Sequence, residues 1–183
     1  VIALLPALLV GMYNVGYQHL LATGELVRGG LTSALFWKAF GFGFLAVLPY
    51  ILVSYITGLG IEFTVAQWKK EEIQEGFLVT GILIPLIVPI NTPLWMVAIA
   101  TAFAVIFAKE VFGGTGYNIF NVALITRAFL FCSYPTKMSG DAVWVANDTI
   151  FGLGNTLPDS FTCATPLGQI AQGAAVNSNL CDM

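Results

Sequence analysis

Residues 35–58 read LFWKAFGFGFLAVLPYILVSYITG, and this stretch decides the fold class. It is an apolar run of about 24 residues, and about 20 are enough for a helix to cross the hydrocarbon core of a bilayer. Its one charged residue, Lys38, lies near one end, and Tyr50 and Tyr55 lie towards the other. Lysine and tyrosine near the ends of such a run are typical of a helix that spans from one membrane interface to the other.

The composition of the whole chain supports this interpretation. Hydrophobic residues make up 57% and charged residues 9% of the 183 residues, and the mean hydropathy is +0.84. Water-soluble domains contain about 25% charged residues, so the apolar surface of this chain must face lipid. The net charge of -3 and the scattered basic residues exclude nucleic acid as a partner. The three cysteines have no metal-ligand spacing, so neither a zinc site nor a disulfide framework is expected.

The other apolar segments predict a multi-span bundle. We expect spans near residues 1–17, 35–58 and 94–112, two short or re-entrant segments at 76–90 and 117–134, and an extramembrane loop over 135–183. Prolines break the first short segment, and polar side chains interrupt the second. The prediction is an all-α integral membrane protein, a helical bundle with broken or re-entrant helices like half of an internally repeated transporter fold. Irregular backbone at membrane depth is tolerated where it lines a site, which indicates a function inside the bilayer.

Two expectations concern the ends of the chain and its orientation. The sequence opens with Val1 inside an apolar run, so we expect a piece of a longer protein whose C-terminal half is missing. Lys69 and Lys70 favour the cytoplasmic side by the positive-inside rule. The loop after residue 134 is then predicted on the opposite side, whether the two short segments both turn back or both cross.

The segment from Lys109 to Asn121 is the first candidate site. Gly113, Gly114, Thr115 and Gly116 leave exposed backbone N–H groups that could cradle ligand oxygens. Asn118 and Asn121 are spaced so that they would share one helix face. Alternatively, the glycines permit close helix packing and the amides hold helices together. The residues alone leave both interpretations open.

Two charged residues in apolar surroundings are the next candidates. Arg127 must pair with an acid, a carbonyl oxygen or a bound anion, and we favour an ion pair with Glu110 or Asp141. Glu62 lies at an apolar boundary, where it could cap its helix or pair with Lys69.

Several motifs together resemble one membrane protein family. Read alone, residues 159–167 (DSFTCATPL) are a loop with turn and cap residues ahead of a short helix. However, most of 58–173 resembles the B-subunit family of sodium-translocating NADH:quinone reductases. The resemblance lies in Gly113-Gly114-Thr115-Gly116, Asn118, Asn121, RAFLF at 127–131, Tyr134-Pro135 and MSGDAVW at 138–144.

This resemblance implies the cofactor sites. In that family a flavin transferase esterifies a threonine to the phosphate of FMN, and the matching residue is Thr165, with Asp159, Thr162 and Ala164 in the same motif. Cys163 stands where the motif has glycine, and Val122 stands where the family has a familiar proline. The resemblance places a second, non-covalent flavin, riboflavin, at Asn118 and Asn121 with Gly114, Thr115 and Gly116. It places the quinone region at Gly58, Gly60 and Glu62.

The implied function is that of a redox-driven sodium pump component in a bacterial inner membrane. Electrons would pass through covalent FMN and riboflavin towards ubiquinone or menaquinone, coupled to sodium export. Other subunits must supply the NADH site, because no nucleotide-binding fingerprint follows a strand in this chain. No catalytic side chain and no metal ligand is expected here. The alternatives are the D-type component of a ferredoxin:NAD electron-transport complex, which shares the flavin threonine, and a channel or transporter without redox chemistry.

Overall fold

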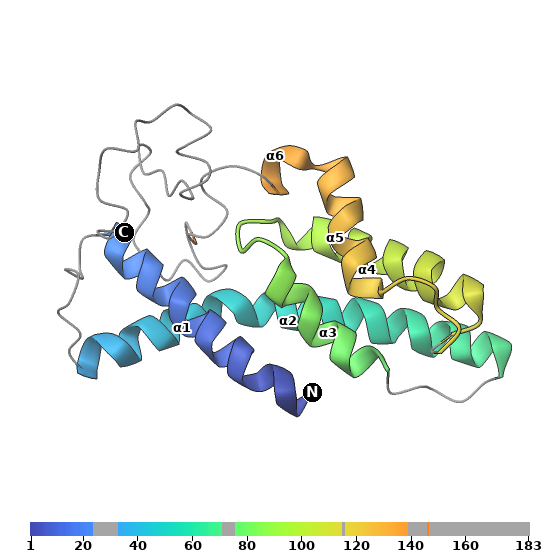
Figure 1. Cartoon of the computed structure of the whole chain (residues 1–183), viewed down its shortest axis with the longest axis horizontal. Helices are drawn as coiled ribbons and strands as arrows, with labels where there is room; N and C mark the ends of the chain where they lie inside the picture. Colours follow the sequence, from blue (N-terminus) through green and yellow to red (C-terminus); the bar gives the residue numbers. More distant parts are fainter. Residues whose placement is uncertain (24–32, 71–75, 115, 139–145, 147–183) are drawn as a thin grey trace.

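The computed structural model describes residues 1–23, 33–70, 76–114, 116–138 and 146, and every regular element within these residues is helical (Figure 1). The elements are η1 (Ile2–Leu4), α1 (Leu5–Ala22), α2 (Ser33–Lys69), α3 (Phe77–Ile87), α4 (Leu94–Ala104), the π-helical turn η2 (Val105–Lys109), the 3-10 turn η3 (Glu110–Phe112), α5 (Val122–Ser133) and α6 (Pro135–Met138). The predicted all-α class is therefore confirmed.

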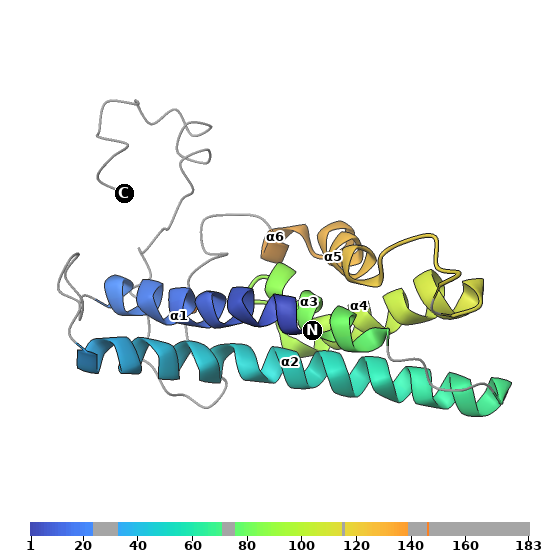
Figure 2. The ribbon, with the colours of Figure 1, turned by 60° about the horizontal axis from the view of Figure 1, so that its bottom comes forward.

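The long helix α2 organises the bundle. α1 lies along the first half of α2, and α3 and α4 pack against its second half, with α5 resting on α3 and α4 (Figures 1 and 2). At 1.5 Å per residue, α2 is about 55 Å long, whereas the hydrocarbon core is about 30 Å thick. Ser33–Lys69 and Leu94–Phe112 are long and apolar enough to cross a membrane. α2 continues to Lys69 rather than ending near Gly58. Its last turns therefore carry Glu62 and Lys69, the first of the two adjacent lysines.

Glycines let α1 and α2 approach closely. A Cβ atom at Gly16 would collide with the backbone carbonyl of Ala39, and one at Gly43 would collide with the carbonyl of Met12. Small residues at such crossings allow backbones to meet where lipid provides no hydrophobic driving force between helices.

We expect Gly43→Ala to destabilise the α1–α2 crossing by about 1–3 kcal/mol or more, because the obstructing atoms are backbone atoms that cannot rotate away. The measurement is the thermal unfolding of the full-length protein in detergent. Gly41→Ala is the matched control, because a Cβ at Gly41 meets nothing within 4 Å. Equal melting temperatures for the two variants would contradict this packing.

The break after α3 has a local cause and compensating contacts. Pro89 disfavours helical backbone at the preceding residue, and Val88 is extended with φ -92° and ψ 137°. The freed carbonyl groups find side-chain donors: Tyr50 donates to the carbonyl oxygens of Ile90 and Thr92. Arg127 donates from Nη1 to the Ile87 carbonyl oxygen at 2.7 Å. Irregular backbone is thus satisfied by protein, as lipid surroundings require.

Helix ends meet at two places in the bundle. Lys69 bonds Glu110, so α2 and the α4–η3 segment finish together. Trp95 at the start of α4 packs edge-on against Tyr134 at the end of α5, with ring centroids 5.8 Å apart. This contact follows the turn whose carbonyl oxygens bind Tyr50, in the middle of α2. The segments containing α3 and α5 therefore each lead away from the Lys69 end of α2 towards the contact between Trp95 and Tyr134.

Residue 146 lies against the end of α1. His19, near the end of α1, is 3% exposed, and its Nδ1 lies 2.9 Å from the Ala146 carbonyl oxygen. Its ring stacks on Phe42 with centroids 3.9 Å apart. The predicted flavin-attachment residue Thr165 lies outside the described residues.

Candidate functional site

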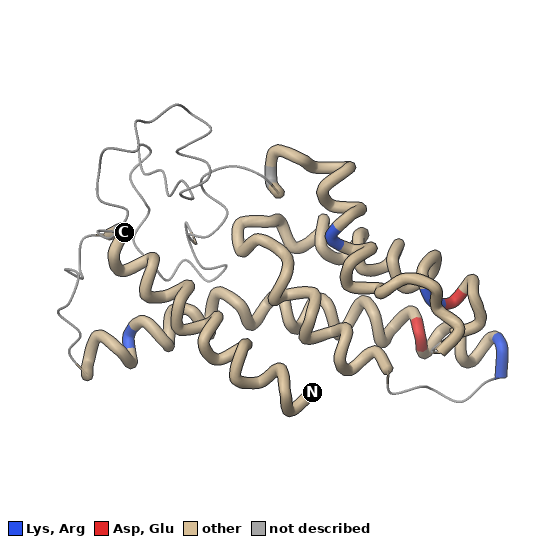
Figure 3. The backbone as a smooth tube through the Cα atoms, in the orientation of Figure 1, with Lys and Arg blue, Asp and Glu red and all other residues tan. Residues whose placement is uncertain are grey.

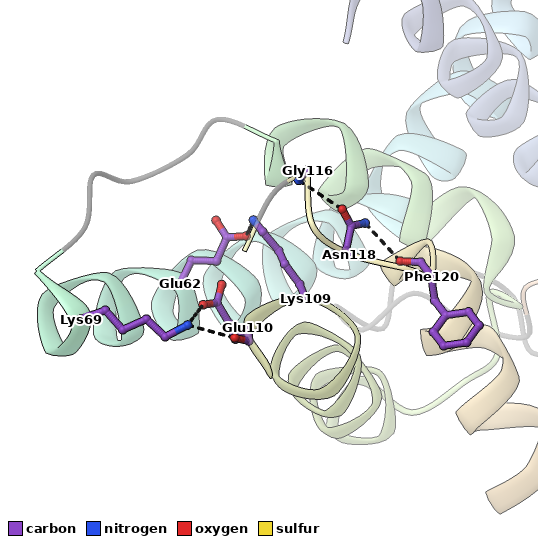
Figure 4. Close-up of polar contacts among 7 residues, drawn as sticks. All are labelled: Glu62, Lys69, Lys109, Glu110, Gly116, Asn118 and Phe120. Atoms are coloured by element: carbon purple, nitrogen blue, oxygen red, sulfur yellow. Dashed lines mark hydrogen bonds and ion pairs between the residues drawn. The ribbon is translucent and has the colours of Figure 1, made fainter. Parts of the chain in front are cut away.

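Charged residues are sparse along the described helices, and several of them gather near the ends of α2 and of the α4–η3 segment (Figure 3). Glu62 on α2 and Lys109 on η2 form a buried ion pair there, with side chains 5% and 6% exposed (Figure 4). Because burying charges costs free energy unless they are paired, each residue depends on the other. The sequence suggested Lys69 as a partner of Glu62, and this prediction was wrong. Lys109, which ends the apolar run 94–112, lies inside the bundle.

A second ion pair lies beside the first. Lys69 donates from Nζ to the Glu110 carbonyl oxygen at 2.9 Å and lies 3.5 Å from Glu110 Oε2. The side chains of this second pair are more exposed to solvent than those of the first, with 35% of Lys69 and 14% of Glu110 exposed. Consecutive residues, Lys109 and Glu110, thus reach back to two positions on α2 separated by two turns (Figure 4).

The helix faces explain why Lys109 is buried. Ser54, Gly58 and Glu62 repeat every four residues along the buried face of α2. On α4 and η2, the buried residues include Val97, Thr101, Val105 and Lys109, with the same spacing. Residues four apart share a helix face, so each helix presents one buried stripe. Lys109 lies on a π-helical turn, a form that is frequent at functional sites.

The glycine loop follows η3, and its three described glycines use their own N–H groups within the loop and with the preceding turn. Gly113, Gly114 and Gly116 have φ values of 107°, 92° and 99°, which L side chains rarely adopt. Their N–H groups donate to the Glu110 carbonyl oxygen, the Lys109 carbonyl oxygen and Asn118 Oδ1, respectively. The expected cradle of free glycine N–H groups is therefore not formed by these three residues. Thr115 lies outside the described residues.

The two asparagines do not share a helix face, because α5 begins only at Val122. Asn121 is the N-cap of α5, and its Oδ1 accepts from the N–H groups of Ala123 at 2.9 Å and Leu124 at 3.4 Å. Asn118 lies in the preceding loop and donates from Nδ2 to the Phe120 carbonyl oxygen at 3.1 Å (Figure 4). Asparagine caps helices well because its side chain replaces the missing backbone acceptor, and this preference explains why the helix begins after residue 121 rather than at 117.

These residues nevertheless border one pocket. The pocket has a volume of about 210 Å³ and is lined by Gly76, Thr80, Lys109, Asn118, Ile119, Phe120, Asn121 and Val122. Polar groups from α3, η2 and the loop before α5 meet there beside apolar side chains. A small number of polar groups among apolar walls is the usual make-up of a ligand site.

The residues of the predicted quinone region take different places. Gly58 packs against the Phe77 ring, which leaves no room for a side chain, whereas a Cβ at Gly60 would meet nothing within 4 Å. Glu62 is linked through Lys109 to the pocket that Asn118 and Asn121 border. Residues assigned to two separate sites from the sequence are thus neighbours.

Arg127 does not pair with Glu110, which is the one of its two expected acids that the described residues include. Its guanidinium group binds the Ile87 carbonyl oxygen, and Glu110 pairs with Lys69 instead. Asp141 lies outside the described residues, as do Asp159, Thr162, Ala164 and Thr165. Arg127 therefore holds α5 against the broken end of α3.

Sequence reasoning missed Thr80 as a pocket residue, and it missed that Lys109 pairs with Glu62. Lys109 lies at the end of an apolar run, a position typical of the membrane interface. Its partner, Glu62, is 47 positions away in the sequence. The available signal was that Glu62 and Lys109 were two opposite charges at the ends of two apolar helices. A single sequence does not specify how those helices align.

Comparison with known proteins identifies the relatives of this chain. The model of the NQR2, RnfD, RnfE family matches residues 1–183. The B subunit of the Na(+)-translocating NADH-quinone reductase of Ectopseudomonas mendocina (strain ymp) is 42% identical over 94% of this chain and 44% of the relative.

Two other proteins of the same name give similar values. The protein of Stutzerimonas stutzeri (strain A1501) is 44% identical over 80% of this chain and 40% of the relative. That of Pseudomonas aeruginosa (strain LESB58) is 40% identical over 94% of this chain and 44% of the relative. The chain thus spans less than half the length of the curated relatives it matches. It is an all-helical membrane protein, and it belongs to the NQR2, RnfD, RnfE family.

Proposed function

We propose that the full-length protein is the flavin-carrying membrane component of a sodium-translocating NADH:quinone reductase. It carries electrons through two flavins towards ubiquinone or menaquinone, and this transfer drives sodium export. The protein lies in a bacterial inner membrane as a multi-pass protein, and other subunits provide the NADH site. The names of the relatives support this function over the D-type component of a ferredoxin:NAD complex, although the family includes both.

The pocket between α3, η2 and the loop before α5 is the observation that carries the proposal. A flavin ring has a polar edge with alternating carbonyl oxygens and an N–H group, and an apolar edge with methyl groups. Thr80, Lys109 and the two asparagines suit the polar edge, and Ile119, Phe120 and Val122 suit the apolar edge. Riboflavin, which has no phosphate, is the flavin we assign to this pocket.

The size of the pocket limits how the ring would bind. Its volume of about 210 Å³ is below the roughly 300–1,000 Å³ usual for ligand sites. Part of the ring therefore fits among the described residues, and the rest of the molecule would extend beyond them. Asn121 Oδ1 already caps α5, so its Nδ2 is the atom of that side chain available for the ligand.

The covalent FMN belongs on Thr165, through a phosphoester formed by a flavin transferase. A hydroxyl followed by proline in a loop is accessible to a modifying enzyme. Tyr134 packs on Trp95 at the start of α4, and Ala146 bonds His19 on α1, so neither lies at the Lys69 end of α2. This supports a position for the loop on the side of the membrane opposite to the two lysines.

Asn118→Leu is expected to weaken riboflavin binding by about 1 kcal/mol, or roughly fivefold, because it removes amide hydrogen bonds from the pocket and its loop. The measurement is the riboflavin content of the purified complex after extraction, with covalent FMN determined in parallel as an internal standard.

The matched variant at the second asparagine is Asn121→Ser. Serine retains an N-cap hydroxyl for α5 but removes the amide nitrogen from the pocket, so lost binding cannot be attributed to a lost cap. Unchanged riboflavin content in both variants would return Asn118 and Asn121 to purely structural roles.

A further inference from the structure

The two members of the buried ion pair differ in their relation to the pocket. Lys109 lines the pocket, whereas Glu62 does not and lies behind it on α2. We propose that Lys109 makes the pocket electropositive and so favours the reduced state of the bound ring. Glu62 is the positioning residue that holds the ammonium group in place. This inference rests on the proposed function, because the ring is that of the non-covalent flavin.

The physical argument concerns distance and screening. A cation that is closer to the ligand than its counter-ion leaves a net positive potential at the ligand. Both side chains are almost fully buried, so solvent screens this potential only weakly. Two electrons from NADH and one proton convert the oxidised ring into an anionic hydroquinone, whose negative charge the positive potential stabilises. Charges near a cofactor ring are one of the main means by which proteins tune cofactor chemistry.

The pair is also poorly explained as a purely structural feature. Glu62 Oε2 is buried and has no hydrogen-bond partner among the described residues. An apolar pair of similar volume is often as stable as a buried ion pair, or more stable. A carboxylate that is only half satisfied is therefore expected where its charge or its hold on a partner has a use.

The neighbouring ion pair provides a matched control. Lys69 and Glu110 have the same chemistry and lie at the same end of the bundle, and Glu110 follows Lys109 directly in the chain. This pair is more exposed to solvent and does not line the pocket. Removing its charges changes the local charge by the same amount at a greater distance from the ring and with more screening.

The test is the midpoint potential of the non-covalent flavin, measured by spectroelectrochemical titration of the purified full complex. The Glu62→Gln/Lys109→Met double variant removes both charges without leaving either one unpaired. We expect the midpoint potential of the flavin to fall by about 30 mV or more in this variant. For a two-electron couple, that shift is a tenfold or larger decrease in the equilibrium constant for reduction. The Lys69→Met/Glu110→Gln variant should leave the potential unchanged.

The outcomes separate this inference from the proposed function. If riboflavin remains bound and its potential is the same in the wild type and the Glu62→Gln/Lys109→Met variant, the inference is overturned. If Asn118→Leu and Asn121→Ser leave riboflavin content unchanged, the proposed flavin site itself is rejected.

A second variant covers failure of the double variant to assemble. Glu62→Asp keeps both charges but shortens the acid, which draws the ammonium group towards α2 and away from the pocket. Its potential should also fall, and an unchanged potential in this variant would equally overturn the inference.

Discussion

Thr165→Val is expected to abolish covalent flavin on this protein. Valine keeps the shape of threonine but has no oxygen to form a phosphoester, so the flavin transferase has no acceptor at this position. The measurement is in-gel flavin fluorescence of the protein after denaturing electrophoresis, with the full-length protein expressed together with the transferase and partner subunits. The expected loss is complete rather than partial, because the bond either forms or does not.

Thr162→Val is the matched control. It makes the same change at a second threonine of the same loop, three residues earlier, and is expected to leave an acceptor at position 165. Fluorescence that persists in Thr165→Val and disappears in Thr162→Val would move the attachment site to Thr162. Fluorescence in both variants would exclude either threonine as the sole acceptor.

Lys109→Met is expected to destabilise the bundle by about 3–5 kcal/mol, because it leaves the Glu62 carboxylate buried without its counter-ion. The measurement is the thermal unfolding of the full-length protein in detergent. Lys69→Met, in the more exposed pair, should cost about 1 kcal/mol or less, because exposed ion pairs contribute little.

The double variant Glu62→Gln/Lys109→Met should recover most of the stability that Lys109→Met loses. Neutralising both partners removes the penalty of an isolated buried charge. A double variant that is as unstable as Lys109→Met would show that packing around the lysine stem, and not the charge, accounts for the loss.

The fold class was predictable because it depends on local properties of the chain. Apolar runs of spanning length and scarce charges indicate a membrane bundle whatever the partners of each helix are. The break near Pro85 and Pro89 was equally readable, because proline acts on its own backbone and on the residue before it. The end of α2 at Lys69 was not predictable in this way. Lys69 and Lys70 indicated the membrane interface, but Lys69 still belongs to the same helix as the apolar span.

The site was less predictable because it depends on how helices align. Asn118 and Asn121 were recognised as candidates, and both border one pocket. Their spacing suggested that they lie on the same helix, but α5 begins only at Val122. The pairing of Glu62 with Lys109 joins α2 to η2, and no local pattern specifies that register. For Arg127, a carbonyl oxygen was one of three partners considered, and an ion pair with Glu110 or Asp141 was favoured. The observed partner is the Ile87 carbonyl oxygen at the end of α3, which becomes available only where the helix breaks.

Peptide mass spectrometry of the full-length protein, purified from its complex, tests the central claim most directly. The claim is that this chain is part of a flavin-carrying redox protein. The predicted result is a peptide covering Thr165 that carries the mass of FMN, with fragment ions placing the adduct on that threonine. An unmodified Thr165 peptide from a catalytically active complex would contradict the account.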